Sequence, residues 1–378
     1  MNRGVPGIGW RSGFHGVCGA SPTLATIQLS RRWGTLFVLL VLVVGCRSRG
    51  NDRPVGALVQ IVAPLGLPPV PYPEDNPPTA ETIALGRRLF YDPRLSKDDT
   101  VACSTCHNPR LHFTDGQRVS LGVGGVTGVR NAPSLLNAAY SPVQFWDGRA
   151  GTLEEQAADP LVGSMEMNQP HEISVAKVRG DVSYRADFVK AFGPGDVTMV
   201  KIEKALASFE RTLLSGDSAF DRYQYGGDKK ALSPSAVHGL ALFTDPAKGN
   251  CAICHSIGEK YALFTDGKFH NTGAGVNGEG QFTDAGRFSQ TKAAADEGAF
   301  KTPSLRNVAL SAPYMHDGSL KTLEDVVGFY AGGGNSSASL DSLIQPLHLT
   351  ARDRADLVEF MKALNGDMPA NAGPPAKE

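Results

Sequence analysis

Apolar residues recur at helical spacing in six segments of this chain, whereas strictly alternating, strand-like stretches are scarce. Thr152, Ser233 and Thr322 each stand where a helix N-cap is expected, and Pro234 suits the first helical turn. The remaining sequence is rich in Gly and Pro, with 43 and 25 residues, and therefore contains long loops. We predict a mainly α fold with helices over residues 82–90, 152–159, 200–214, 233–243, 322–330 and 351–364.

Part of the hydrophobic and polar pattern is repeated within the chain. Leu89-Phe90-Tyr91-Asp92-Pro93 is echoed by Leu242-Phe243-Thr244-Asp245-Pro246. Ala132-Pro133-Ser134-Leu135-Leu136-Asn137 is echoed by Thr302-Pro303-Ser304-Leu305-Arg306-Asn307, and this register, an offset of 170, continues through Thr152-Leu153-Glu154 and Thr322-Leu323-Glu324. A repeat of this length predicts two tandem copies of one structural unit.

Each copy contains one Cys-x-x-Cys-His motif: Cys103-Ser104-Thr105-Cys106-His107 and Cys251-Ala252-Ile253-Cys254-His255. This spacing is typical of c-type haem attachment, with two thioether bonds from the cysteines and the histidine as axial iron ligand. The presence of two such motifs in one chain argues against the alternative of a stray zinc half-site. We therefore predict two covalent haem c groups in two tandem cytochrome c-like domains.

The pattern of the N-terminal region is typical of a targeting segment. Arg31-Arg32 precede an apolar run, residues 33–44, which is too short to span a bilayer and has the length of a signal-peptide core. Gly45 before Cys46 is similar to a bacterial lipobox, which would make Cys46 a lipidated N-terminus; a plain secretory signal is the alternative. Residues 1–30 show no such targeting pattern, so a mis-set start codon is one interpretation of this segment. Export agrees with c-type haem, which is attached outside the cytoplasm.

The predicted organisation is a signal peptide over residues 1–45, a Pro-rich tether over 46–78, haem domains over 79–230 and 231–366, and a tail over 367–378. The chain carries 37 Lys and Arg against 38 Asp and Glu, so its net charge gives no reason to expect nucleic acid as a partner.

The two copies differ at the end of the Thr-Leu-Glu helix. Tyr330 shares an apolar face with Leu323, Val326 and Val327, and its counterpart 170 residues earlier is Pro160. Tyrosine can ligate iron and proline cannot. If this helix faces each haem, the second iron is capped and the first is open. Alternatively Tyr330 is a core aromatic that bonds a haem propionate, and Met315, Met361 or Met368 is the ligand.

These residues resemble the bacterial di-haem cytochrome c peroxidase family, which includes the MauG-type enzymes. The resemblance covers roughly residues 64–366. Besides both haem motifs, it depends on five short stretches: residues 85–92, Phe145-Trp146-Asp147-Gly148-Arg149, Glu166-Met167, residues 302–307, and Pro313-Tyr314-Met315-His316-Asp317-Gly318.

The resemblance implies a peroxidatic haem at His107 and an electron-transfer haem at His255. It implies that Gln156 and Glu166 are distal catalytic residues and that Trp146 conducts electrons between the haems. Glu166 lies between Met165 and Met167, and an apolar setting would raise its pKa towards values useful for acid–base catalysis. His316 would lie near the second haem. Asn131, with Ser311 and Pro313 through their carbonyls, would hold one calcium ion.

The sequence departs from typical peroxidases of this family at two positions. Val123 stands where those enzymes carry a histidine that blocks the first iron until reduction, so we expect a five-coordinate or water-bound first haem that needs no reductive activation. Tyr330 stands where they carry methionine and MauG-type enzymes carry tyrosine. An anionic oxygen ligand would lower the potential of the second haem.

The expected function is reduction of hydrogen peroxide to water at the first haem, with electrons passed through the second haem from a small periplasmic cytochrome c or cupredoxin. The first alternative is a MauG-like enzyme that oxidises side chains of a partner protein through high-valent di-haem states. Tyr330 favours it, but Trp146 is the only tryptophan after the signal peptide, so no second one could relay charge to a protein substrate. The second alternative is a non-enzymatic di-haem electron carrier. We expect a periplasmic protein that touches the membrane only through a lipid at Cys46 and that can form a homodimer.

Overall fold

The structure is a computed structural model that describes residues 52–376. The predicted signal peptide and Cys46 lie outside the described residues. Within the described range, no helix has the length and apolar character needed to cross a membrane.

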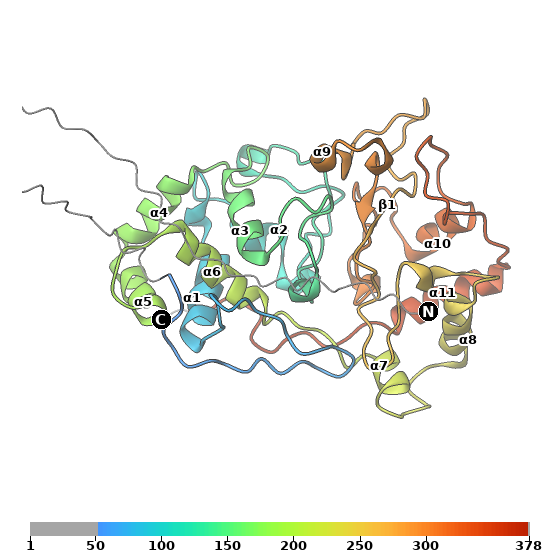
Figure 1. Ribbon diagram of the computed structural model, residues 1–378, viewed down its shortest axis with the longest axis horizontal. Helices are drawn as coiled ribbons and strands as arrows, with labels where there is room; N and C mark the ends of the chain where they lie inside the picture. The colour runs from blue at the N-terminus through green and yellow to red at the C-terminus, as the bar shows by residue number, and fades with distance from the viewer. Residues whose placement is uncertain (1–51, 377–378) are drawn as a thin grey trace, which may run out of the picture. The chain divides into compact units, whose positions relative to one another are not determined.

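The fold is mainly helical, as predicted (Figure 1). The six predicted helices are present within a few residues of their expected bounds: α1 (Ala80–Phe90), α3 (Leu153–Val162), α6 (Met199–Glu210), α8 (Pro234–Thr244), α10 (Leu323–Ala331) and α11 (Ala351–Lys362). The sequence interpretation missed α4 (His171–Gly180), α5 (Val182–Phe192) and the short α7 (Ala219–Gln224). The remaining elements are α2 (Cys103–Cys106), α9 (Phe288–Thr291) and the antiparallel strands β1 (Phe269–His270) and β2 (Phe300–Lys301).

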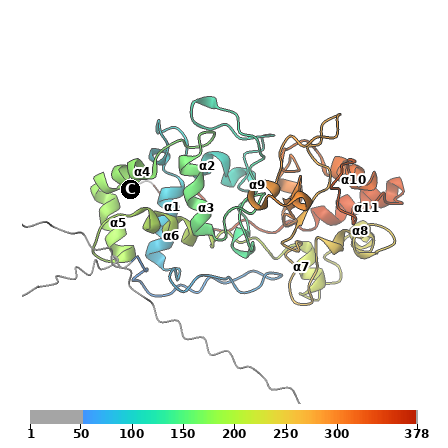
Figure 2. The ribbon, with the colours of Figure 1, turned by 45° about the horizontal axis from the view of Figure 1, so that its top comes forward.

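The same arrangement of three helices occurs twice. Helices α1, α3 and α6 pack together, with α6 touching both others, and α11 makes the corresponding contacts with α8 and α10 (Figure 2). Phe90 packs on Phe209 with ring centroids 5.3 Å apart, and Phe243 packs on Phe360 at 5.0 Å. The predicted internal repeat is therefore also a repeat of helix packing.

A glycine allows the close helix approach in each copy. A Cβ atom on Gly86 of α1 would lie 1.8 Å from the Ala205 carbonyl oxygen of α6. A Cβ on Gly239 of α8 would lie 2.0 Å from the Asp356 carbonyl oxygen of α11. Any larger residue would push the helices apart.

Two hydrophobic cores follow from this duplication. The first is built from residues of α1, α3, α4, α5 and α6, and the second from residues of α7, α8, α10 and α11. Phe220 of α7 is fully buried in the second core, although it precedes the predicted boundary between residues 230 and 231. We call residues 79–215 the first half and residues 216–366 the second half.

Residues 55–78, which we call the strap, were expected to form a Pro-rich tether. They form no helix, but they are hydrogen-bonded to both halves. The Val55 amide donates to Ala191 O (3.0 Å) in the first half, and Gly66 O accepts from the Ala262 amide (3.2 Å) in the second. The predicted tail is held as well, because Arg87 Nε donates to Gly373 O at 2.6 Å.

Candidate haem sites

The first Cys-x-x-Cys-His motif forms one helical turn. The His107 amide donates to Cys103 O at 2.9 Å, which places the histidine directly after the turn of α2. His107 Nδ1 lies 3.1 Å from Phe113 O, so this nitrogen is the protonated donor and Nε2 keeps its lone pair. A histidine oriented in this way is typical of an iron ligand.

The second motif repeats this geometry on a 3-10 turn, Cys251–Ile253. The His255 amide donates to Cys251 O at 2.9 Å, and His255 Nδ1 lies 2.8 Å from Phe264 O. Phe113 and Phe264 are fully buried and adopt positive φ values of 61° and 52°, which are uncommon for bulky residues. This strained backbone presents the carbonyl that orients each histidine, and no feature of the residue pattern predicts it.

Both motifs open on one cavity of about 1500 Å³. A site for one small ligand usually measures ~300–1,000 Å³, so this cavity has room for larger or several groups. Cys106, His107, Cys251, Cys254 and His255 line it, and the structure shows no disulfide among these cysteines. The residues therefore fit two haems, which the cysteine sulfurs and the two histidine Nε2 atoms would hold.

Buried cationic and imidazole groups on the cavity wall support this fit. Lys301 Nζ donates to Ser141 Oγ (2.6 Å), and burial lowers the pKa of Lys301 to about 8, because no carboxylate among residues 52–376 pairs with it. His316 is 3 % exposed and stacks on Phe300 with ring centroids 3.6 Å apart, and its Nε2 has no hydrogen-bond partner within the described range. Haem carries two propionates, which are suitable partners for such donors.

The predicted distal residues gather beside the first motif. Gln156 and Pro160 lie one turn apart on α3, and both line the large cavity together with His107 and Glu166. Burial raises the pKa of Glu166, an effect that the Arg149 charge opposes only in part. The first site therefore combines a carboxyl with a raised pKa, an amide, and a proline that offers no ligand atom.

The loop that contains Val123 lies against Glu166. The Val123 amide donates to the backbone carbonyl of Glu166 at 2.8 Å, so this bond ties the loop to the Glu166 segment. His112 is the nearest histidine in sequence, and it has a buried Nδ1 without a partner in the described part of the chain. His112 is not among the described residues that line the large cavity.

Tyr330 of α10 lines the large cavity together with His255 and both cysteines of the second motif. Burial raises the pKa of its phenol, and the nearby sulfurs of Cys251 and Cys254 add to the shift. Two rival ligands, Met315 and Met361, also line the cavity. Met368 packs instead against the first core, away from the second motif.

Trp146 connects the two halves. Its Nε1 donates to Asn131 O (2.9 Å), and its carbonyl accepts from the Lys301 amide (2.8 Å). The Asn131 amide also donates to His316 O at 2.7 Å. The predicted calcium ligands Asn131, Ser311 and Pro313 line the same cavity, and Asn131 Nδ2 donates to Gln117 O (2.9 Å), which leaves its side-chain oxygen as an acceptor.

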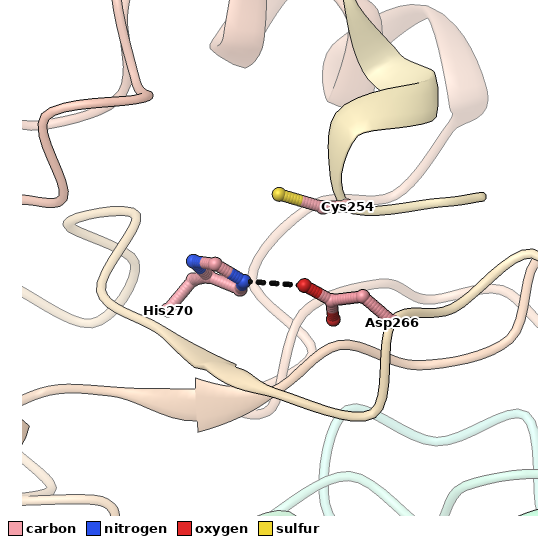
Figure 3. A group of neighbouring side chains, drawn as sticks. All are labelled: Cys254, Asp266 and His270. Carbon is pink, nitrogen blue, oxygen red and sulfur yellow. Dashed lines mark hydrogen bonds and ion pairs between the residues drawn. The ribbon is translucent and has the colours of Figure 1, made fainter. Parts of the chain in front are cut away.

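A charged cluster lies at the second motif (Figure 3). Ligand atoms of Cys254, Asp266 and His270 lie within 4.8 Å of one another. His270 Nε2 lies 2.9 Å from Asp266 Oδ2, and its Nδ1 lies 2.5 Å from Asp341 Oδ2. Because Cys254 belongs to the haem motif, we interpret this group as an ion-paired wall of the second site.

The helical fold and the duplicated site define a di-haem protein. The chain matches the family described as "Di-haem cytochrome c peroxidase" over residues 80–230. It is 41 % identical over 299 residues to "Methylamine utilization protein MauG" of Methylorubrum extorquens, which covers 79 % of this chain and 82 % of the relative. It is 37 % identical over 331 residues to "Cytochrome-c peroxidase IdrP1" of Pseudomonas sp. (strain SCT), with coverage of 80 % and 86 %.

Among solved structures, it is similar to the "MauG-like protein associated with microbial copper homeostasis", with a TM-score of 0.73 and 36 % identity over 80 % of this chain and 95 % of that one. The chain belongs to the di-haem cytochrome c peroxidase family. This confirms the resemblance inferred from the motifs and the prediction of a haem oxidoreductase enzyme. The relatives include both cytochrome c peroxidases and MauG proteins, so the family alone leaves the reaction open between these two.

Proposed function

We propose that this protein reduces hydrogen peroxide to water at a haem held by Cys103, Cys106 and His107. Electrons reach that site through a second covalent haem, held by Cys251, Cys254 and His255, from a small periplasmic cytochrome c or cupredoxin. Each haem belongs to one cytochrome c-like unit of the repeat.

The asymmetry of the two sites carries this proposal. Gln156, Pro160 and Glu166 line a smaller cavity together with Cys103, Cys106 and His107 of the first motif. Tyr330 of α10 instead lies near Cys251 and Cys254 of the second motif. A pure electron carrier would need both irons capped by protein ligands. The pair of Gln156 and Glu166 has no use in a carrier, but it suits a site where a small oxidant binds.

The protein groups at the first site supply proton transfer and orientation. A haem iron at His107 supplies the redox chemistry. Glu166 accepts the proton of one peroxide oxygen and returns it to the other, which leaves as water. Burial raises the pKa of the Glu166 carboxyl, which makes its carboxylate a better proton acceptor for this step. The Gln156 amide orients the peroxide by hydrogen bonding.

Three further features belong to this proposal. Val123 in place of a blocking histidine leaves the first site ready for peroxide without prior reduction. A calcium ion bound by Asn131, Ser311 and Pro313 would tie the halves together next to Trp146, the proposed electron path. A signal peptide and a lipid on Cys46 would place the enzyme in the periplasm, attached to the membrane.

The test is single-turnover reaction of the holoprotein with hydrogen peroxide in a stopped-flow instrument. Glu166→Gln should slow peroxide cleavage by about 10²–10⁴-fold, the usual effect of losing a general acid–base group, while both haem spectra stay intact. Glu172→Gln, on the exposed surface of α4, is the matched control and should react like the wild type. An unchanged rate in Glu166→Gln would remove Glu166 from the mechanism.

The second candidate function is oxidation of a partner protein's side chains, which the resemblance to the MauG-type enzymes implies. Tyr330 at the second site favours it, since tyrosinate ligation would lower the potential of that haem and disfavour electron uptake from a high-potential donor. Rapid steady-state oxidation of reduced cytochrome c by peroxide would support the first function. Slow cytochrome turnover together with peroxide-dependent modification of a partner protein would support the second.

A further inference from the structure

A second carboxyl group lies at the first haem site and has no role in the mechanism above. Glu210, the last residue of α6, is 4 % exposed. Among residues 52–376 neither of its carboxyl oxygens has a hydrogen-bond donor, and Oε2 is fully buried. Burying a polar group without a partner is unfavourable, so packing alone does not account for this residue.

Glu210 faces the same space as Glu166. Both carboxyls, with Gln156, line a smaller cavity of about 60 Å³ beside the first motif. Both also lie close enough to Cys103 to raise the pKa of its thiol. The cavity has room for a few water molecules, and three polar side chains offer them hydrogen bonds.

The helix repeat shows what an ordinary residue at this position would be. Phe209 and Phe360 occupy equivalent places on α6 and α11, since they pack on the equivalent residues Phe90 and Phe243. The residue after each is therefore equivalent too: Glu210 in the first half and Met361 in the second. Both line a haem cavity, but only the first half places an ionisable group there.

The stoichiometry of the proposed reaction requires a proton source. One hydrogen peroxide, two electrons and two protons give two water molecules. When Glu166 moves a proton from one peroxide oxygen to the other, it supplies no net proton. Both net protons must therefore enter a buried site from elsewhere while the donor supplies the electrons.

We propose that Glu210 is the proton-holding group that refills the distal site, passing its proton through water in the smaller cavity to Glu166. The carboxylic acid becomes a carboxylate when it delivers the proton, and it is reprotonated from solvent before the next delivery. This inference rests on the proposed function.

The charges around Glu210 suit this role. Arg211 is engaged by Glu154 in two hydrogen bonds of 2.8 and 3.0 Å, so it is not available to hold Glu210 as a carboxylate. Burial raises the pKa of Glu210 to about 8, an effect opposed by Arg211 and strengthened by Glu154. The other titratable groups that line the smaller cavity are Glu166, His107, which would be an iron ligand, and Cys103 and Cys106, which a haem would convert to uncharged thioethers. The group is therefore protonated at neutral pH, yet it can release its proton.

The experiment measures the rate of hydrogen peroxide cleavage by the holoprotein between pH 6 and pH 9.5. The wild-type rate should fall as the pH rises through about 8, where Glu210 loses its proton. Glu210→Gln and Glu210→Met, the latter copying the second half, should be at least tenfold slower at pH 7 and should lack this alkaline fall. Glu210→Asp should keep it. Glu203→Gln, on the same helix but away from the smaller cavity, should behave like the wild type.

The outcomes separate this inference from the proposed function. A wild-type protein that does not cleave peroxide would refute the proposed function. Cleavage that depends on Glu166 but is unchanged in rate and pH profile in Glu210→Gln would overturn the inference alone. If Glu210→Gln and Glu210→Met lose haem, the rates of the wild type and of Glu210→Asp between pH 6 and pH 9.5 still test the proposal. If neither of these two rates falls at alkaline pH, the proposal is overturned.

Discussion

The buried ion pair between Asp221 of α7 and Arg306 should be the largest single electrostatic contribution to holding the strap on the second half. Arg306 Nη1 and Nη2 each lie 2.9 Å from an Asp221 carboxylate oxygen, and the two side chains are 0 % and 1 % exposed. The guanidinium also donates to Gly66 O of the strap (2.6 Å) and to Ala262 O (2.7 Å). One side chain thus connects three segments.

Replacing Asp221 by Asn tests the magnitude of this contribution. The variant leaves a buried guanidinium without its counter-charge, and removing one partner of such a pair typically lowers stability by about 3–5 kcal/mol. The carboxylate also accepts from Ser218 N (2.9 Å) and Ser218 Oγ (2.8 Å), so the start of α7 is weakened as well. We therefore expect the free energy of unfolding of Asp221→Asn to be lower than that of the wild type by about 3–5 kcal/mol. Urea denaturation followed by circular dichroism and haem absorption measures this difference.

The matched control lies on the same helix. Arg222 forms an exposed pair with Asp217, in which the side chains are 47 % and 50 % exposed, and Arg222→Ala should change stability by less than about 1 kcal/mol. The double variant Asp221→Asn/Arg306→Met contains no unpaired buried charge, so its loss should be smaller than the sum of the two single losses. If Asp221→Asn and Arg222→Ala destabilise equally, the reasoning about the buried pair is wrong.

Three other predictions address the second site and the junction between the halves. Tyr330→Phe should change the electron paramagnetic resonance signal of one ferric haem only and raise its potential; two unchanged signals would show that Tyr330 is not a ligand. Asn131→Ala should weaken calcium binding by about tenfold or more in calorimetric titration of chelator-treated holoprotein, and equal affinity would remove Asn131 from the site. In the haem-free chain the Cys254 sulfur is the first cause that raises the pKa of His270, followed by Asp341 and Asp266. A thioether at Cys254 would leave the two carboxylates, which still raise the pKa of His270. A raised histidine pKa stabilises the fold fully below about pH 6.5, and the contribution is lost as the pH rises through the raised pKa. Asp341→Asn should therefore reduce stability at pH 6 and have a shrinking effect as the pH rises, whereas a pH-independent difference would contradict the assignment.

Much of the helical fold could be predicted because its signals are local. Thr152 and Thr322 accept from Glu155 N and Asp325 N as N-caps, so α3 and α10 begin where the sequence indicated. Helix α5 was missed although its signal was present: Asp181 caps it, and Tyr184, Phe188, Ala191 and Phe192 are buried at helical spacing. Helix α4 is mostly polar and buries only Ser174 and Val178, which leaves little pattern to read.

The residues of the candidate sites likewise divide into those that local sequence signals predict and those that depend on distant segments. The haem motifs are contiguous in sequence and were predicted directly. The roles of Glu210, Lys301 and His270 depend on their surroundings, which come from distant segments: α2 and α3 for Glu210, Ser141 for Lys301, and Asp341 for His270. The strap was predicted as extended from its prolines. Its attachment could not be predicted, because Gly66 contributes a backbone carbonyl that leaves no mark in the side-chain pattern.

One end of the described chain is bonded to both halves of the protein and the other end to the opposite half, and this affects how the protein unfolds. The strap, near the start of the described chain, is bonded to Arg306 in the second half, while Gly373, near its end, is bonded to Arg87 in the first. Neither half can open without releasing a segment that anchors the other. The duplicated units should therefore melt together as one cooperative block, and excising either of them would yield a fragment that lacks part of its own support.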